Sequence, residues 1–312
     1  MSFDPTVARS QFPALRRRVD GRAALYLDGP GGTQVPRPVI DAMAAFMEAG
    51  GSNHGGPFVT SRETDAVVAQ ARLAMADLFN AGPDEIAFGQ NMTSITLSVS
   101  RALARTWEAG DDIVLTRLDH DANVSPWMIA AAERGVNVRM ADFDADAGCV
   151  LDPGAVAALL GPRTRLVAVT HASNALGTIV DVAGISAAAH AAGARVYVDA
   201  VHYTPHGPVD VRAMGCDFLA ASSYKFFGPH TGIFYGRHEL LEELDAVKIR
   251  PAPSQAPGKW ETGTQSFESL AGVTAAVDYL ASLSAETDRR RALVDTMNAT
   301  AAYESSLSER FL

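Results

Sequence analysis

The chain has 312 residues, of which 47% are hydrophobic and 20% are charged, a composition typical of a globular protein with a sizeable core. Its formal net charge of −10 argues against a nucleic-acid partner, because phosphate binding needs a basic face. We find no secretion-type leader and no apolar run long enough to cross a membrane. Two cysteines are too few for a disulfide framework, so we expect a cytoplasmic protein without a membrane partner.

The first part of the chain reads as a helix followed by glycine-rich turns. Asp4-Pro5 is typical of a helix start, and the helix is predicted to run to about Arg18. An apolar run at 24–27 resembles a strand and leads into Asp28-Gly29-Pro30-Gly31-Gly32-Thr33. The glycine-rich loop 50–57 fits either close approach to a ligand or neighbouring chain, or a simple linker. Helices are predicted at 36–46 and 61–79.

From residue 86 onward, short apolar runs alternate with helical patterns. The predicted strands lie at 86–88, 113–115, 136–140, 166–169 and 196–198. This alternation indicates right-handed βαβ crossovers, and we predict a three-layer α/β/α fold with a mostly parallel sheet. Ligands in such sheets bind beyond the carboxyl ends of the strands. Polar residues follow the predicted strands at these ends, namely 91–94, His120, Asn174, Asp199 and Lys225.

Lys225 stands in an unusual place. It lies between two apolar strand-like runs, 218–221 and 232–235, with two phenylalanines directly after it. Lysine is rarely buried without a partner, so one interpretation is an exposed turn. The other is a semi-buried amine that attacks a carbonyl group and forms a Schiff base.

A Schiff base in amino-acid chemistry suggests pyridoxal 5′-phosphate (PLP), which needs further partners. A carboxylate must pair with its pyridine nitrogen, and Asp199 at a predicted strand end can supply it. The phosphate needs N–H groups at a helix start, which Gln90 to Ser94 can provide. His120 can stack on the ring.

The chain resembles the fold-type I PLP enzymes of the class V aminotransferase group, and within it the cysteine desulfurase-like branch. Six motifs in the same order carry the resemblance, and together they extend over nearly the whole chain. They are Tyr26-Leu27-Asp28-Gly29-Pro30-Gly31-Gly32-Thr33, Asp119-His120-Asp121-Ala122-Asn123, Ser173-Asn174-Ala175-Leu176-Gly177-Thr178, Val198-Asp199-Ala200-Val201-His202, Ser222-Ser223-Tyr224-Lys225-Phe226-Phe227-Gly228-Pro229-His230 and Trp260-Glu261-Thr262-Gly263-Thr264.

The resemblance implies a role for each residue around the cofactor ring. Lys225 would form the internal aldimine and then move the Cα proton. Asp199 would pair with the pyridine nitrogen, and His120 would stack on the ring. Asn174 would hydrogen-bond the phenolic oxygen, beside His202, which stands where desulfurases often have glutamine.

A second group is implied around the cofactor phosphate. Met92 and Thr93 would hold it together with Ser222. Tyr224 replaces a common histidine and would donate its hydroxyl there. Thr264 would reach the phosphate of the partner subunit, which implies a homodimer with shared active sites.

The resemblance does not extend to the residues that desulfurases use to handle sulfur. Desulfurases carry a cysteine nucleophile and a substrate-binding arginine in a C-terminal small domain, and neither segment appears before Leu312. Cys149 and Cys216 are better interpreted as incidental or buried thiols. His202 and His206 have the spacing of a zinc pair, but Pro205 argues against a regular helix there, so we predict no metal site.

We therefore predict a PLP-dependent enzyme acting on a small amino acid, with desulfurase-like C–S cleavage of L-cysteine or a related substrate favoured. The alternatives are an aminotransferase or epimerase of the same fold, or a truncated PLP-binding protein without turnover. A sulfur acceptor protein is an expected partner of a desulfurase. The predicted organisation is an N-terminal helical segment at 1–22, a large PLP-binding domain at 23–265, and helices at 266–312 that lead into a largely missing small domain.

Overall fold

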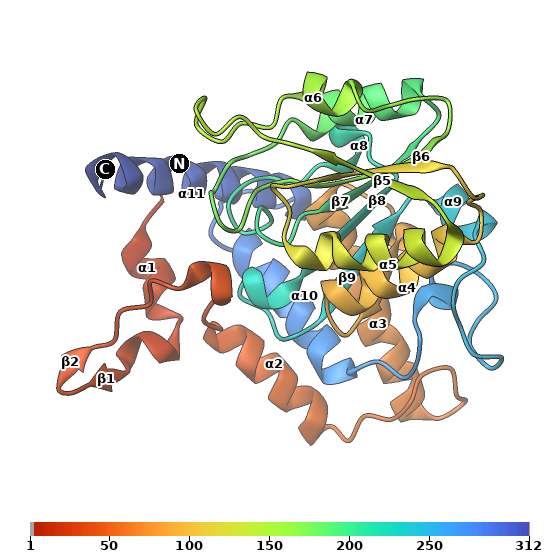
Figure 1. The fold of residues 1–312 in the computed structure, drawn as a ribbon. Coiled ribbons are helices and arrows are strands. Elements are labelled where there is room, and N and C mark those ends of the chain that lie inside the picture. The colour runs from red at the N-terminus through yellow and green to blue at the C-terminus, as the bar shows by residue number, and fades with distance from the viewer. Residues whose placement is uncertain (1–2, 312) are drawn as a thin grey trace.

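The computed structural model describes residues 3–311. Its N-terminal part contains the short helix α1 (Pro5–Ser10), the hairpin strands β1 (Arg18–Val19) and β2 (Arg22–Ala23), and the 3-10 turns η1 (Pro13–Arg16) and η2 (Gly29–Gly31). Helices α2 (Arg37–Glu48) and α3 (Val59–Phe79) follow. In Figure 1 the hairpin extends away from the rest of the molecule.

A seven-stranded sheet forms the centre, in the order β3-β9-β8-β7-β6-β4-β5. Strands β4 to β8 are parallel neighbours, and β9 runs antiparallel to both β3 and β8. The predicted mostly parallel sheet is confirmed. The strands are β3 (Ile86–Gly89), β4 (Asp112–Thr116), β5 (Asn137–Ala141), β6 (Thr164–Thr170), β7 (Arg195–Asp199), β8 (Phe218–Ser222) and β9 (Gly232–Gly236).

Helices pack on both faces of the sheet, because the central strands are apolar on both sides. Alternate residues of β7 divide between two cores: Val196 and Val198 face one, and Tyr197 faces the other. The first core also contains α6 and α7, and the second α4 and α5, which lie on opposite sides of the strands in Figure 1. These helices span Met92–Ala104 (α4), Ser125–Arg134 (α5), Pro153–Ala157 (α6) and Val182–Ala191 (α7).

The remaining helices complete the chain. Helix α10 (Phe267–Ala281) packs against α2 and α3, and the long α11 (Arg289–Phe311) packs against α10. The shorter elements are α8 (Val211–Met214), α9 (His238–Glu243), η3 (Pro83–Glu85), η4 (Asp121–Asn123), η5 (Ser223–Lys225) and η6 (Gly258–Trp260). Within residues 3–311, no helix is long and apolar enough to span a bilayer. The predicted domain boundaries stay a prediction.

Two N-terminal predictions were wrong. The expected helix to about Arg18 ends at Ser10, and a 3-10 turn begins at Pro13, because proline cannot donate the backbone hydrogen bond that a continuing helix needs. The apolar run 24–27 pairs with no strand of the described chain, and Leu25 and Leu27 are largely exposed.

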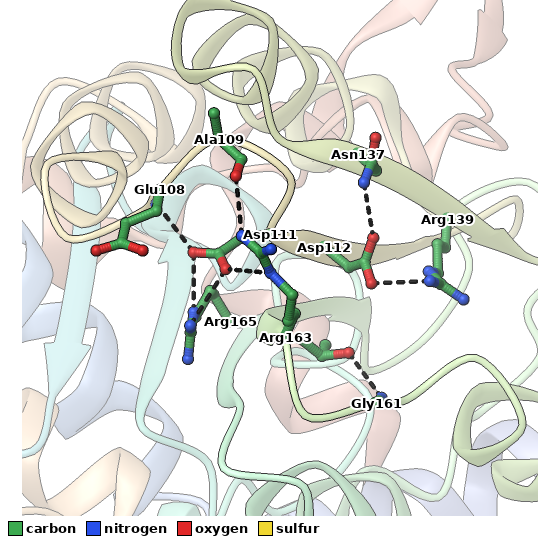
Figure 2. A network of polar contacts seen from close by, with 10 residues as sticks. Glu108, Ala109, Asp111, Asp112, Asn137, Arg139, Gly161, Arg163 and Arg165 are labelled. Carbon is green, nitrogen blue, oxygen red and sulfur yellow. Dashed lines mark hydrogen bonds and ion pairs between the residues drawn. The ribbon is translucent and has the colours of Figure 1, made fainter.

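A cluster of charged side chains connects the amino-terminal ends of β4, β5 and β6 through ion pairs and hydrogen bonds (Figure 2). These strand ends are opposite to the carboxyl ends of the strands. The buried Asp111 carboxylate accepts hydrogen bonds from Arg165 Nε at 2.9 Å and Arg163 Nε at 3.3 Å, and also from the Glu108 N–H. Beside it, Asp112 pairs with Arg139 at 2.8 Å. Hydrogen bonds from Arg165 lower the pKa of Asp111 to about 2.

We expect Asp111→Ala to lower the free energy of unfolding by about 2 kcal/mol at pH 7, because two arginines lose a buried acceptor. Since the folded pKa lies below the unfolded value, the contribution of Asp111 is present above about pH 4 and is lost as the pH falls toward 2. Urea unfolding at pH 7 and pH 3 measures this. Asp142→Ala is the control, because Asp142 pairs with Arg117 on the surface; an equal loss in both variants would contradict the prediction.

Candidate active site

A cavity of about 670 Å³ lies beyond the carboxyl ends of the parallel strands. It brings together nine of the ten residues that the sequence predicted around a cofactor: Met92, Thr93, His120, Asn174, Asp199, His202, Ser222, Tyr224 and Lys225. These residues come from strand ends and turns that are up to 133 positions apart (225 − 92). A cavity of this size is typical of a cofactor or small-molecule site.

Asp199 ends the central strand β7 and is only 5% exposed. Its Oδ1 accepts the Val201 N–H at 2.9 Å, which fixes the carboxyl group at the strand end. Burial raises the pKa of Asp199 to about 6, while the Val201 N–H, His120 and Lys225 act in the opposite direction. A cationic partner in the cavity would oppose this effect of burial and favour the charged carboxylate.

Lys225 ends the turn η5 directly after β8 and is 8% exposed. Within the described chain no carboxylate forms an ion pair with it; its Nζ donates to the Pro30 carbonyl and lies 4.8 Å from the centroid of the Tyr224 ring. The structure thus places a buried amine in the cavity, and the exposed-turn interpretation is wrong.

The first turn of α4 opens onto the same cavity. Asn91 caps the helix by accepting the Ser94 N–H at 2.9 Å, and the Met92 N–H donates to Ser222 Oγ at 3.1 Å. Helix starts carry partial positive charge and free N–H groups. Because the Met92 and Ser94 N–H groups are bonded within the chain, the donors suited to a phosphate here are the N–H and hydroxyl of the exposed Thr93 and the Ser222 hydroxyl.

His120 and Tyr224 stand on two other turns around the cavity. His120 Nδ1 accepts the Ala122 N–H at 3.0 Å, so the neutral ring carries its proton on Nε2. The Tyr224 ring stacks on His230 with centroids 4.9 Å apart. Both side chains are therefore held in place before any ligand enters.

Asn174 and His202 line the cavity from the loops after β6 and β7. The His202 ring lies 5.2 Å from that of His206, which pairs with Glu304. Burial lowers the pKa of His202, helped by the neighbouring His206. Within residues 3–311, no cluster of three or more histidine, cysteine, aspartate or glutamate residues could hold a metal.

The sequence of this chain is similar to those of known proteins. The family model of aminotransferase class V matches residues 25–306. The chain belongs to the aminotransferase class-V family. A cysteine desulfurase of Klebsiella pneumoniae is 35% identical over 91% of this chain and 73% of its own length, and one of Serratia proteamaculans is 34% identical over 92% and 74%.

Several solved structures are also similar to this chain. An Escherichia coli cysteine desulfurase matches with a TM-score of 0.80 and 29% identity, over 93% of this chain and 74% of its own. One from Thermococcus onnurineus has a TM-score of 0.87 and 25% identity, over 99% and 76%. A C-DES variant with glycine covalently linked to its PLP cofactor has a TM-score of 0.74 and 26% identity, over 86% and 72%. The predicted family resemblance and fold type are confirmed.

Thr264 is the predicted site residue of this class-V chain that the structure places elsewhere. It lines a separate hollow with Asn53, His54 and Arg72. The hollow includes part of the glycine-rich loop 50–57, for which both a ligand contact and a linker were considered. The role of Thr264 toward a partner subunit stays a prediction.

Sequence reasoning missed two features behind the site. Asp119 accepts hydrogen bonds from Thr116 and from Asn123 Nδ2, the latter at 2.7 Å, and burial raises its pKa to about 8. The loop 28–33 also covers Lys225, through contacts that cross more than 190 positions of sequence. The glycines of that loop were visible in the sequence, but nothing local indicated where it docks.

The two thiols of this class-V chain differ in environment. Cys216 is 1% exposed, and burial raises the pKa of its thiol, whereas Cys149 is partly exposed. Neither lines the cavity. We expect 5,5′-dithiobis(2-nitrobenzoate) to titrate one thiol in the native protein and two after unfolding, because the thiolate is the reactive form. Rapid reaction of both native thiols, or retention of the fast phase in Cys149→Ser, would contradict this.

Proposed function

We propose that this chain is a PLP-dependent enzyme that cleaves the C–S bond of L-cysteine or a closely related small amino acid. The observation that carries the proposal is one cavity holding a buried lysine amine, a buried strand-end carboxylate and a helix start. Cysteine desulfurases with 35% identity support the choice of reaction within the family.

The donor set of the cavity fits PLP, whose phosphate, pyridine nitrogen and carbonyl carbon need three different partners. Thr93 at the start of α4 offers an N–H and a hydroxyl group for the phosphate, and Ser222, whose Oγ accepts the Met92 N–H, offers its hydroxyl hydrogen. Asp199 offers a carboxylate for the ring nitrogen, and Lys225 an amine for the carbonyl carbon. Few other cofactors would use all three groups.

When bound, PLP supplies an electron sink that lets a proton leave the Cα of an amino acid. The protein residues orient the reactants and move that proton. Asp199 would hold the ring nitrogen protonated, and His120 would limit the movement of the ring by covering one face. Lys225 would take the proton from the substrate Cα and return it later. Asn174 and His202 would bind the polar edge of the ring from their two loops.

Products distinguish the proposed reaction from its alternatives. The purified protein is loaded with PLP and given L-cysteine, L-cysteine sulfinate or L-selenocysteine, with dithiothreitol as reductant. Desulfuration yields alanine and sulfide from cysteine, whereas a lyase yields pyruvate. Transamination requires an added 2-oxo acid, and racemisation appears as D-amino acid. Alanine with an equal amount of sulfide supports the proposal; pyruvate, a new amino acid from the oxo acid, or no turnover contradicts it.

We also propose that the protein is a homodimer in which Thr264 of one subunit contributes to the cavity of the other, and that a sulfur acceptor protein takes the product. The exposed position of Thr264 outside its own cavity supports the first part. Mixing Lys225→Ala and Thr264→Val subunits tests the shared site. If the sites are shared, a mixed dimer contains one cavity with both residues intact, so activity should rise on mixing; unchanged activity would contradict the shared site. The cytoplasmic location stays a prediction.

A further inference from the structure

The loop 28–33 docks on the turn that carries Lys225. The Thr33 N–H donates to the Tyr224 carbonyl at 2.9 Å, and the Thr33 hydroxyl donates to the same carbonyl at 2.9 Å. The same hydroxyl oxygen accepts the Phe227 N–H at 2.8 Å. A single side chain therefore bonds the backbone directly before Lys225 and two residues after it.

The backbone at Phe227 needs such support. Its φ of 71° lies in the left-handed region, which is uncommon for residues other than glycine and especially for bulky ones. The Phe227 ring is fixed by edge contacts with Phe12 at 5.3 Å and Tyr279 at 6.2 Å between centroids. The ring and the Thr33 hydroxyl together hold a conformation that the free chain would disfavour.

The loop also fits closely around this turn. Gly32 has a φ of 141°, and a Cβ there would lie 3.0 Å from Tyr224 Cδ2. The Pro30 carbonyl accepts a hydrogen bond from the Lys225 amine. Both Pro30 and Gly31 line the cavity. The contact thus consists of backbone groups, the Thr33 hydroxyl and the Lys225 amine, with a glycine at the position where a Cβ would lie close to Tyr224.

We propose that Thr33 is a positioning residue: its hydroxyl bridges the Tyr224 carbonyl and the Phe227 amide and so holds the Lys225 turn in the arrangement that reacts. This rests on the proposed function only in taking Lys225 as the reactive amine. Thr33 itself does not line the cavity, so it acts through the turn.

Thr33→Val and Thr33→Ser separate the hydroxyl from the shape of the side chain. Valine keeps the shape but leaves the Phe227 N–H without its acceptor, and we expect the apoprotein to bind added PLP about tenfold more weakly. Serine keeps the hydroxyl and should restore the dissociation constant to about twice the wild-type value or less. Thr274→Val is the control, because Thr274 is also half-buried but donates within α10; its affinity should equal that of the wild type.

Amide hydrogen exchange at Phe227 gives a second readout that does not depend on activity. Protection should be present in the wild type and in Thr33→Ser, and lost in Thr33→Val. Rapid exchange at Phe227 in the wild type would overturn the proposal even if the valine variant failed to fold. So would unchanged PLP affinity in Thr33→Val, or an equal loss in the serine variant. If wild-type Lys225 took up no PLP at all, the proposed function would fail instead.

Discussion

Replacing Lys225 with alanine is expected to reduce the turnover of L-cysteine by at least about a thousandfold. The amine is the group in the cavity that can both bind a carbonyl carbon and move the Cα proton, and each of these roles is worth orders of magnitude in rate. Steady-state assays of alanine formation with saturating PLP measure the effect. Added methylamine should restore part of the activity, because the space left by the side chain admits a small amine.

Lys259→Ala is the matched control for this variant. Lys259 is also buried, at 7% exposure, but its Nζ donates to the Glu242 carbonyl at 2.7 Å outside the cavity. Its loss should lower stability while leaving turnover per folded molecule close to that of the wild type. Equal activity losses in the two variants would show that burial, rather than position, explains the effect of Lys225.

Asp199→Asn is expected to make the apoprotein more stable at pH 8 while greatly impairing catalysis. Folding raises the pKa of Asp199 to about 6, above the unfolded value of about 3.9. The folded chain therefore holds this proton more tightly, and its stability falls as the pH rises between these values. An asparagine carries no charge at any of these pH values and removes that penalty, which is worth about 1–3 kcal/mol above pH 6.

The same substitution removes the negative charge that would hold the pyridine nitrogen protonated. We expect turnover to fall by about a hundredfold or more, with PLP still able to enter. Urea unfolding of the apoprotein at pH 4.5 and pH 8 tests the stability part: the variant should gain stability mainly at pH 8. Asp111→Asn is the control, and it should change the free energy of unfolding at pH 8 in the opposite direction, because Arg165 lowers the pKa of Asp111. A destabilised Asp199→Asn apoprotein at pH 8 would refute this account of the site.

The parts of the site that lie at strand ends could be predicted from sequence. Asp199 and Lys225 each follow an apolar run, and parallel strands bring such ends to one edge of the sheet. The same rule identified Asn174, and the family motifs added residues that it did not single out, such as His202.

The parts that depend on distant tertiary contacts could not be predicted. The docking of Thr33 on Tyr224 crosses 191 positions, and the left-handed backbone of Phe227 follows from that contact rather than from its own residue type. The run 24–27 has strand composition but no strand partner in the described chain, so local propensity alone gave the wrong element. The raised pKa of the partly buried Asp119 likewise depends on packing around η4.

The central claim is that the Lys225 amine binds the cofactor, and borohydride reduction tests it most directly. The protein loaded with PLP is reduced, digested and mapped by mass spectrometry. The chain has three lysines, Lys225, Lys248 and Lys259, so each can be assigned. We predict one phosphopyridoxyl group per chain, on Lys225. A label on Lys248 or Lys259 alone, or none after reduction, would contradict the account.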